Sequence, residues 1–306
     1  MGNIFDIINV PLGFLFRVIF MLVQNYGWAL VLFTIVTKLI LLPLSMKQQK
    51  SMIKMQAIQP KLAELQRKYQ YDKDKLNQET MKLYQQGGVN PMGGCLPLLI
   101  QLPLLIALYN IIRSPLTYVV QLGQYGLPTV QEVFDALVNM GHLAAGSMID
   151  EINIAKLITE HREALTAVLP NLSGAMDINF GFYGLDLSGV PSAAGNSILL
   201  IIPVLAGGTT FLSTWLSQKI SGNKPQETSP DNTSASSMKM MNYIFPFMTA
   251  FFAYTMSAGL GVYWTLSNII QVIQQYVLTN YYKKKDVAEA PKKEHFRERE
   301  SKRRKK

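Results

Sequence analysis

Long apolar runs alternate with charged segments along this chain of 306 residues. An α-helix needs about 20 mostly apolar residues to cross a bilayer, and several of these runs reach that length. The pattern therefore predicts an all-α polytopic membrane protein. Its five predicted spans are residues 26–46, 92–113, 196–217, 239–257 and 258–281. The last two are joined only by a turn at Ser257-Ala258-Gly259, so we expect them to pack as an antiparallel pair.

The first 25 residues predict an amphipathic helix that lies in the membrane interface. Asp6, Gly13, Arg17 and Gln24 form a narrow polar stripe on an otherwise apolar sequence. An uncleaved signal anchor is the alternative. A cleaved signal peptide fits poorly, because the start lacks positive charge and Arg17 interrupts the apolar core.

Residues 47–91 predict a helical hairpin outside the membrane. Apolar positions from Met55 to Tyr69 follow alternating three- and four-residue spacing, which indicates a helix with one packing face. A second helix is expected over about 73–86, with the bend at Tyr71-Asp72. The candidate contact residues of this hairpin are Lys61, Leu62, Leu65, Tyr69 and Tyr84.

Three further segments lie outside the predicted spans. Residues 114–195 are acidic, and helices are expected near 129–140 and 148–169. Residues 218–238 are rich in Ser, Asn, Pro and Lys and predict a loop. Residues 282–306 are strongly basic without apolar periodicity, which predicts a disordered tail.

Charge sets the predicted orientation. The chain carries a formal charge of +9, and its cations gather in 47–91, in 219–239 and in the tail. Because Lys and Arg are enriched in cytoplasmic loops, we expect the N-terminus outside the cell, 114–195 outside, and a cytoplasmic tail. The single cysteine, Cys95, excludes an internal disulfide.

The sequence predicts no enzyme, and we expect neither a cofactor nor a metal. It contains no phosphate-binding GxxxxGK[ST] loop, no zinc-binding HExxH and no GxSxG nucleophile turn. No Asp or Glu lies in any predicted span, which counts against a cation-coupled transporter. Lys38, in the first span, consequently has no counter-ion within the spans, although insertion of a central Lys costs about 2.5–3.5 kcal/mol. We interpret Lys38 as the charge of a wet cavity; a Lys that merely extends to the membrane surface is the alternative.

Other polar residues in the spans are candidates for the lining of that cavity. Gln101 lies between Pro97 and Pro103, where neighbouring helices or water must satisfy the freed carbonyls. Gln101 could equally form an ordinary interhelical hydrogen bond, and Trp264 could serve only in packing or in an interfacial belt. The remaining candidates are Thr210, Ser213, Asn268 and Gln271. Four polar or amphipathic residues of the last span, Trp264, Asn268, Gln271 and Gln275, follow four-three-four spacing, which predicts one polar face that points to the bundle interior or to water.

The chain resembles the YidC-type membrane insertases of bacteria, and the similarity extends over most of it except 114–180 and the tail. The block around Gly93-Gly94-Cys95-Leu96-Pro97 is specific to that family. The segments that carry the resemblance are LLPLSMKQQKSM (41–52), IQPKLAELQRKY (58–69), GVNPMGGCLPLLIQLPLLIALY (88–109), FYGLDLS (182–188), IIPVLAGGTTFLS (201–213) and AGLGVYWTLSNIIQVIQQ (258–275).

The resemblance implies five transmembrane helices around a hydrophilic groove that opens to the cytoplasm and to lipid. In the family a basic residue of the first span, commonly Arg, projects into the groove; Lys38 occupies that position and keeps the charge without the bidentate fork of Arg. The start of the chain resembles the short form of single-membrane bacteria.

The expected function is energy-independent insertion of nascent membrane proteins into the plasma membrane of a bacterium, alone or with the Sec translocon. A channel or transporter, or an assembly chaperone without insertion activity of its own, is the alternative. Residues 283–306 could contact ribosomal RNA or anionic lipids; no DNA partner is expected.

Overall fold

The computed structural model describes residues 6–88, 96–193, 197–220 and 233–304; at 6, 56, 96–102, 197, 218, 220, 233–242 and 283–304 it describes the backbone alone. The chain forms two compact units. The first unit comprises residues 1–39, 98–211 and 238–268, and the second comprises 40–97, 212–237 and 269–306.

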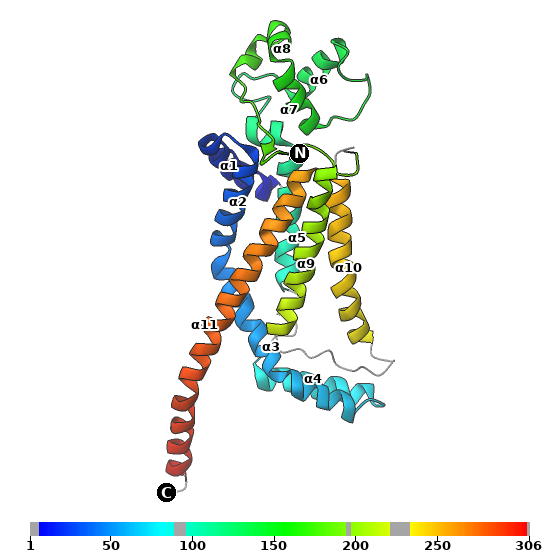
Figure 1. Cartoon of the computed structure of the whole chain (residues 1–306). Coiled ribbons are helices and arrows are strands. Elements are labelled where there is room, and N and C mark those ends of the chain that lie inside the picture. The colour runs from blue at the N-terminus through cyan, green and yellow to red at the C-terminus, as the bar shows by residue number, and fades with distance from the viewer. Residues whose placement is uncertain (1–5, 89–95, 194–196, 221–232, 305–306) are drawn as a thin grey trace. The chain divides into compact units, whose positions relative to one another are not determined.

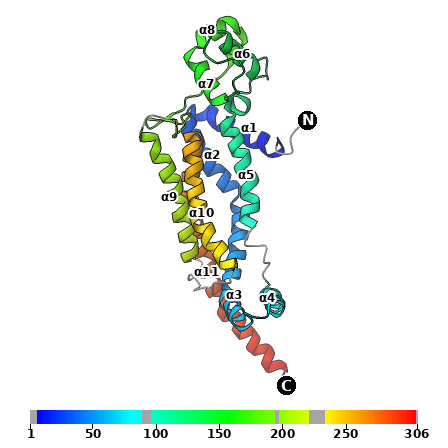
Figure 2. The ribbon, with the colours of Figure 1, turned by 90° about the vertical axis from the view of Figure 1, so that its right-hand side faces the viewer.

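The first unit is a helical bundle with a small cap at one end (Figures 1 and 2). It contains α1 (Asp6–Val23), nearly all of α2 (Tyr26–Ile40) and α5 (Leu96–Arg113), the first part of α9 (Ile201–Ile220), most of α10 (Thr233–Thr255) and the start of α11 (Ala258–Arg304). The short helix η4 (Ser197–Leu200) precedes α9.

Aromatic side chains of α1 and α2 form the centre of this unit. Tyr26 is buried, and its hydroxyl donates to the carbonyl of Ile112 at 3.2 Å. Its ring lies 5.5 Å from that of Phe16 and 4.9 Å from that of Phe180, measured between centroids. The cluster thereby joins α1, α2, α5 and the segment after the cap.

Small residues allow the bundle helices to approach closely. A Cβ on Gly207 of α9 would lie 2.8 Å from the Cβ of Ala250 on α10, and a Cβ on Gly261 of α11 would lie 2.4 Å from the side chain of Ile202. Such small-residue contacts are typical of helices packed in membranes, where backbone approach replaces the hydrophobic drive.

The cap consists of α6 (Val130–Asn139), α7 (Glu151–Glu160) and α8 (Arg162–Val168), with η2 (Leu116–Val120) and η3 (Pro170–Gly174) beside them. The helices expected near 129–140 and 148–169 are therefore confirmed. Thr129 and Glu132 form a reciprocal capping box at the start of α6.

A two-stranded antiparallel sheet follows the cap. β1 (Gly181–Phe182) pairs with β2 (Leu185–Asp186), with Gly181 opposite Asp186. Phe182 packs on the start of α2 at Gly27, where a Cβ would lie 2.2 Å from the phenyl ring. Only glycine fits at that position without displacing Phe182 and the β1–β2 sheet.

The second unit contains the predicted hairpin. α3 (Leu42–Lys68) and α4 (Lys73–Gly87) pack against each other, and the carboxylate of Asp72 caps α4 by accepting from the N–H of Lys75. The sequence predicted a first span that continues to Met46, but the helix breaks at Leu41 and α3 begins at Leu42. Pro43 explains the break, because proline favours the first turn of a helix and disrupts a helix interior.

Five spans were predicted, but fewer of the described helices are both long enough and apolar enough to cross a bilayer. Among the described residues, Ile198–Ser217 is long and apolar enough to cross a bilayer, and Tyr26–Ile40 with Leu42–Met55 would make a second if they form one broken span. Shorter apolar helices occupy Ile7–Val23, Pro103–Arg113 and Tyr243–Thr255. Polar residues such as Asn268 and Gln275 lower the hydropathy of α11 below that of a simple span.

The tail also differs from the prediction. Where the sequence predicted disorder from residue 282, α11 continues as a helix to Arg304. Ala, Glu, Lys and Arg dominate this stretch, and their high helix propensity favours continuation of a helix that is already formed.

Candidate functional site

Lys38 lies in the last turn of α2 and is half-buried. Its ammonium makes no hydrogen bond or ion pair within the described part of the chain, where the ion pairs are Lys82–Glu79, Lys156–Asp186 and Arg162–Asp177. A partly desolvated cation without a partner is unfavourable. Among the described residues, Lys38 thus lacks the anionic partner that would offset its partial burial.

The structure brings two of the predicted residues together, Thr210 of α9 and Asn268 of α11. The amide nitrogen of Asn268 donates to the hydroxyl of Thr210 at 2.7 Å and lies 3.3 Å from that of Thr209. Thr210 is buried and donates in turn to the carbonyl of Ala206 at 2.7 Å. These hydrogen bonds join α9 to α11 and place a cluster of polar groups inside the otherwise apolar bundle.

Ser213 and Gln271 belong to the second unit. Ser213 is buried one turn after Thr210 on α9, whereas Gln271 is exposed. The buried glutamine of α11 is Gln275, whose side-chain oxygen accepts from the hydroxyl of Ser217 at 2.6 Å. The four-three spacing of the polar residues found this face of α11, but spacing alone did not separate Gln275 from Gln271.

A second buried hydrogen-bonded pair of polar side chains, Gln49 and Thr279, is not among the residues predicted from the sequence. The amide of Gln49 on α3 donates to the hydroxyl of Thr279 on α11 at 2.8 Å, and both side chains are buried. Thr279 lies four residues after Gln275, so the polar face of α11 extends one turn further than predicted. That periodicity was the available signal for Thr279.

The structure describes the side chain of Trp264 but not that of Gln101. Trp264 is half-buried in the first unit, with its ring 6.4 Å from that of Phe252 on α10. Gln101 lies on α5, but its side chain is outside the residues whose side chains the structure describes.

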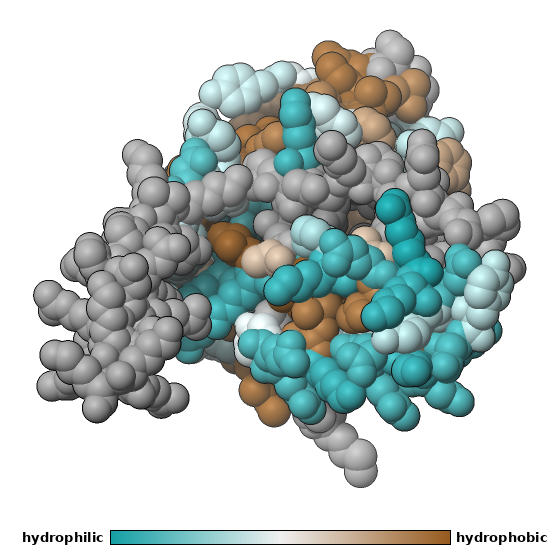
Figure 3. All heavy atoms as spheres, turned by 90° about the horizontal axis from the view of Figure 1, so that it is seen from below, coloured by the Kyte–Doolittle hydropathy of each residue, from teal (hydrophilic) through white to brown (hydrophobic). Residues whose placement is uncertain are grey.

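The hairpin residues divide into a packed seam and an exposed face. Leu62, Leu65 and Tyr84 are half-buried, whereas Lys61 is exposed. Tyr69 carries the ammonium groups of Lys68 and Lys75 over its ring, at 5.3 and 5.7 Å from the centroid. The view from below in Figure 3 shows hydrophilic side chains gathered on that face, with apolar side chains exposed among them.

Two carboxyl groups of the first unit have shifted pKa values, Glu151 of α7 in the cap and Asp186 of β2. Burial raises the pKa of Glu151 although Thr117 donates to it through both its N–H, at 2.8 Å, and its hydroxyl, at 2.7 Å. At Asp186, burial alone would raise the pKa, but hydrogen bonds from Ser188 and the charge of Lys156 outweigh it and lower the pKa. Within the described residues no group of three or more His, Cys, Asp or Glu side chains could hold a metal ion.

Comparison with known proteins points to one family. Residues 18–285 match the model of the 60Kd inner membrane protein family. A membrane protein insertase YidC of Fusobacterium nucleatum is 31% identical over 278 residues, covering 91% of this chain and 98% of that protein. The membrane protein insertase YidC of Chlorobium limicola is 31% identical over 268 residues, covering 88% of this chain but 35% of that protein. A crystal structure of an active YidC insertase aligns with 26% identity and a TM-score of 0.45, covering 90% of this chain and 47% of that one.

Proposed function

Since this chain belongs to the 60Kd inner membrane protein family, whose relatives above are membrane protein insertases, we propose that it inserts nascent membrane proteins into a bacterial plasma membrane. The hairpin of α3 and α4 makes the first contact with an apolar segment of the client. The short polar tail of that segment then enters a hydrophilic groove that contains Lys38. The groove shortens the apolar path that polar residues must cross.

The energy for insertion comes from the client itself. Partition of its apolar segment into lipid is favourable by about 25 cal/mol per Å² of apolar surface. The chain carries no phosphate-binding loop for ATP hydrolysis, and insertion by partition needs none.

Lys38 is the observation that carries this mechanism. It is half-buried on an apolar helix, and the described residues supply no ionic partner for it. Opposite unit charges about 8 Å apart attract by about 2 kcal/mol at an effective dielectric constant of about 20. An acidic client tail would therefore gain a substantial free energy on reaching Lys38. The hydrogen-bonded Thr210 and Asn268 support the same idea, because they place polar groups inside the bundle.

The test is insertion of a single-span client with an acidic tail into liposomes that contain only this protein. Protection of the tail from added protease reports translocation. We expect Lys38→Ala to reduce the protected fraction by about fivefold or more, and Lys38→Arg to retain it because the charge remains. A client whose tail has no charge is the matched control and should be equally protected with both variants. Equal protection of the acidic tail with Lys38→Ala would remove the electrostatic step.

Two alternatives remain as outcomes of this test. Absence of protection, with the protein shown to be folded, would favour an assembly chaperone that needs partners. Leakage of small solutes from the same liposomes would favour a channel or transporter.

The same proposal includes partners and orientation. The basic stretch 283–306 would lie in the cytoplasm, where ribosomal RNA and anionic lipids both attract Lys and Arg. Cooperation with the Sec translocon is part of the proposal as well. Cosedimentation with ribosomes, compared between the full chain and a chain truncated at residue 282, tests the RNA contact; equal cosedimentation would leave lipid as the partner.

A further inference from the structure

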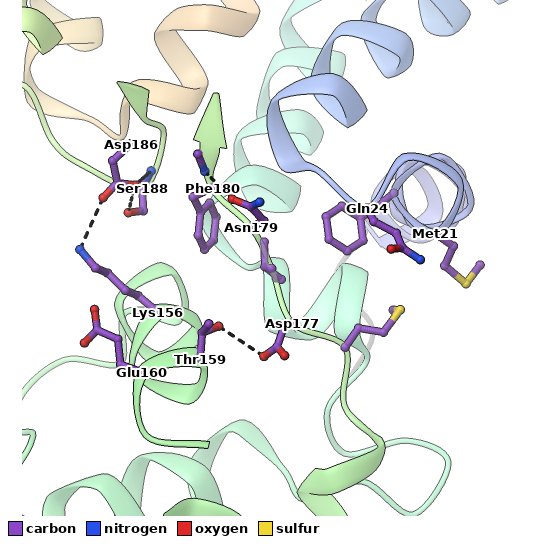
Figure 4. Close-up of a pocket in the computed structure, with 14 residues that line it drawn as sticks. Met21, Gln24, Lys156, Thr159, Glu160, Asp177, Asn179, Phe180, Asp186 and Ser188 are labelled. Carbon is purple, nitrogen blue, oxygen red and sulfur yellow. Dashed lines mark hydrogen bonds and ion pairs between the residues drawn. The ribbon is translucent and has the colours of Figure 1, made fainter. Parts of the chain in front are cut away.

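A pocket of about 770 Å³ lies between the cap and the end of α1, entirely within the first unit. Figure 4 shows Lys156, Thr159 and Glu160 of α7 on one side of it and Met21 and Gln24 of α1 on the other. An extended segment, residues 177–180, runs between these two sides. None of the insertion steps above uses this pocket.

The segment 177–180 has the burial pattern of a β-strand although it belongs to neither strand of the sheet. Ile178 and Phe180 are buried, with 4% and 7% of their surface exposed, and Asp177 and Asn179 are exposed. This alternation is the period of two that strands show. The segment leads directly into β1, so it is a strand continuation without a neighbour along most of its length.

Its backbone is only partly paired. The carbonyl of Asn179 accepts from the N–H of Tyr26 and that of Phe180 from the N–H of Leu187, each at 3.0 Å. In contrast, the N–H groups of Asp177, Ile178 and Asn179 and the carbonyls of Asp177 and Ile178 have no hydrogen-bond partner among the described residues. Unpaired groups along an extended chain can receive another strand.

The side chains around the pocket define which peptide would fit. Lys156 pairs with Asp186 at 3.4 Å, and Arg162 pairs with Asp177 at 2.6 Å. Glu160 has no ion pair within the described part of the chain, so the site has one carboxylate in excess. Met21 and Met176 add flexible apolar surface that adapts to different side chains.

We propose that residues 177–180 bind an extended peptide as an added strand, and that this peptide is a translocated segment of a client carrying a Lys or Arg that pairs with Glu160. The source of the peptide rests on the proposed insertase function. A client segment that has just crossed the membrane has no backbone partners of its own, and strand addition supplies them without requiring a particular sequence. A segment with only acidic residues, such as the tail of the test client above, would be repelled by Glu160 and would insert without using this site.

The test measures binding of fluorescent ten-residue peptides to the purified full chain in lipid nanodiscs by anisotropy. The reference peptide alternates apolar and polar residues and has a central Lys. We expect it to bind, and we expect N-methylation of alternate backbone amides to weaken binding at least tenfold, because the side chains are kept while the strand hydrogen bonds are lost. Equal binding of the methylated peptide, or no binding of the reference peptide, would overturn the proposal.

Charge is tested separately. Replacement of the central Lys by Glu in the peptide should weaken binding severalfold, and Glu160→Lys in the protein should reverse that preference. Glu163→Lys is the matched control, since Glu163 is exposed on α8 and does not line the pocket. Circular dichroism of both variants establishes that they are folded. A peptide preference unchanged by Glu160→Lys in the folded protein would refute the role of Glu160.

The liposome insertion assay on the same preparations separates this proposal from the proposed function. Intact insertion without peptide binding would overturn only the proposed peptide site and would leave the insertase function standing. Peptide binding without insertion would remove the client as the source of the peptide and leave the strand-binding site.

Discussion

Glu151 shows how a single buried carboxyl makes the stability of the cap depend on pH. Burial raises its pKa above the usual 4.5. The folded cap therefore binds a proton more tightly than the unfolded chain, so its stability should fall as pH rises from about 4.5 through the raised pKa. We expect Glu151→Gln to remove this fall while its amide oxygen still accepts a hydrogen bond from Thr117.

Thermal unfolding of the detergent-purified protein between pH 4 and pH 7 measures this effect. The wild type should lose more stability than Glu151→Gln over that range. Glu163→Gln, at an exposed position on α8, should follow the wild type. Parallel pH profiles of the wild type and Glu151→Gln would contradict the prediction.

At the residue scale, the sequence indicates which polar residues are unusual, but it does not indicate which hydrogen-bond partners they have. Lys38 stands out as a cation within an apolar run, and the structure finds it half-buried. Gln275 and Gln271 look equivalent along the sequence, yet the first is hydrogen-bonded to Ser217 and the second is exposed. The difference depends on how α11 is rotated against its neighbours, and helical spacing does not contain that information.

At the scale of elements, the contact between α9 and α11 depends on the hydrogen bond from Asn268 to Thr210. A double-mutant cycle with Asn268→Ala and Thr210→Val should give a coupling free energy of about 0.6 kcal/mol, with about 1.7 kcal/mol as the upper end for such bonds in membranes. The unfolding free energy in mixed micelles is the quantity to measure.

The control for this cycle is Thr249→Val in combination with Asn268→Ala. Thr249 is buried too, but its hydroxyl donates to the carbonyl of Phe245 within its own helix, α10. Its coupling to Asn268 should be near zero. If the Asn268–Thr210 pair also shows no coupling, the hydrogen bond does not stabilise the helix contact.

Helix identity follows from the sequence more reliably than helix ends. Alternating apolar spacing predicted the helix that α3 forms around Met55 to Tyr69, and the second helix expected over about 73–86 is α4, whose start Asp72 marks as a capping residue. In contrast, the break at Leu41 was missed, because a proline such as Pro43 is tolerated in a membrane span wherever neighbours satisfy the freed carbonyl. The sheet of β1 and β2 was also missed, since strands of two residues are too short for any periodicity.

For the whole molecule, the uneven distribution of charge predicts which segments face the cytoplasm. The hairpin segment 47–91 is rich in Lys, while 114–195 has few cations among many carboxylates. From the positive-inside rule we expect the hairpin in the cytoplasm and the cap outside the cell. Both the capture of clients by the hairpin and the strand-binding pocket depend on this orientation.

Single cysteines introduced at exposed positions test the orientation. The one natural cysteine, Cys95, is first replaced by serine. Met148 beside the cap and Tyr71 at the bend of the hairpin are then each changed to cysteine, since their side chains are 88% and 94% exposed and should react freely wherever reagent reaches them. We expect a membrane-impermeant maleimide to modify Met148→Cys in intact cells and Tyr71→Cys only after permeabilisation. The opposite pattern would place the hairpin outside, where it could not meet a client before insertion, and would contradict the whole mechanism rather than one residue of it.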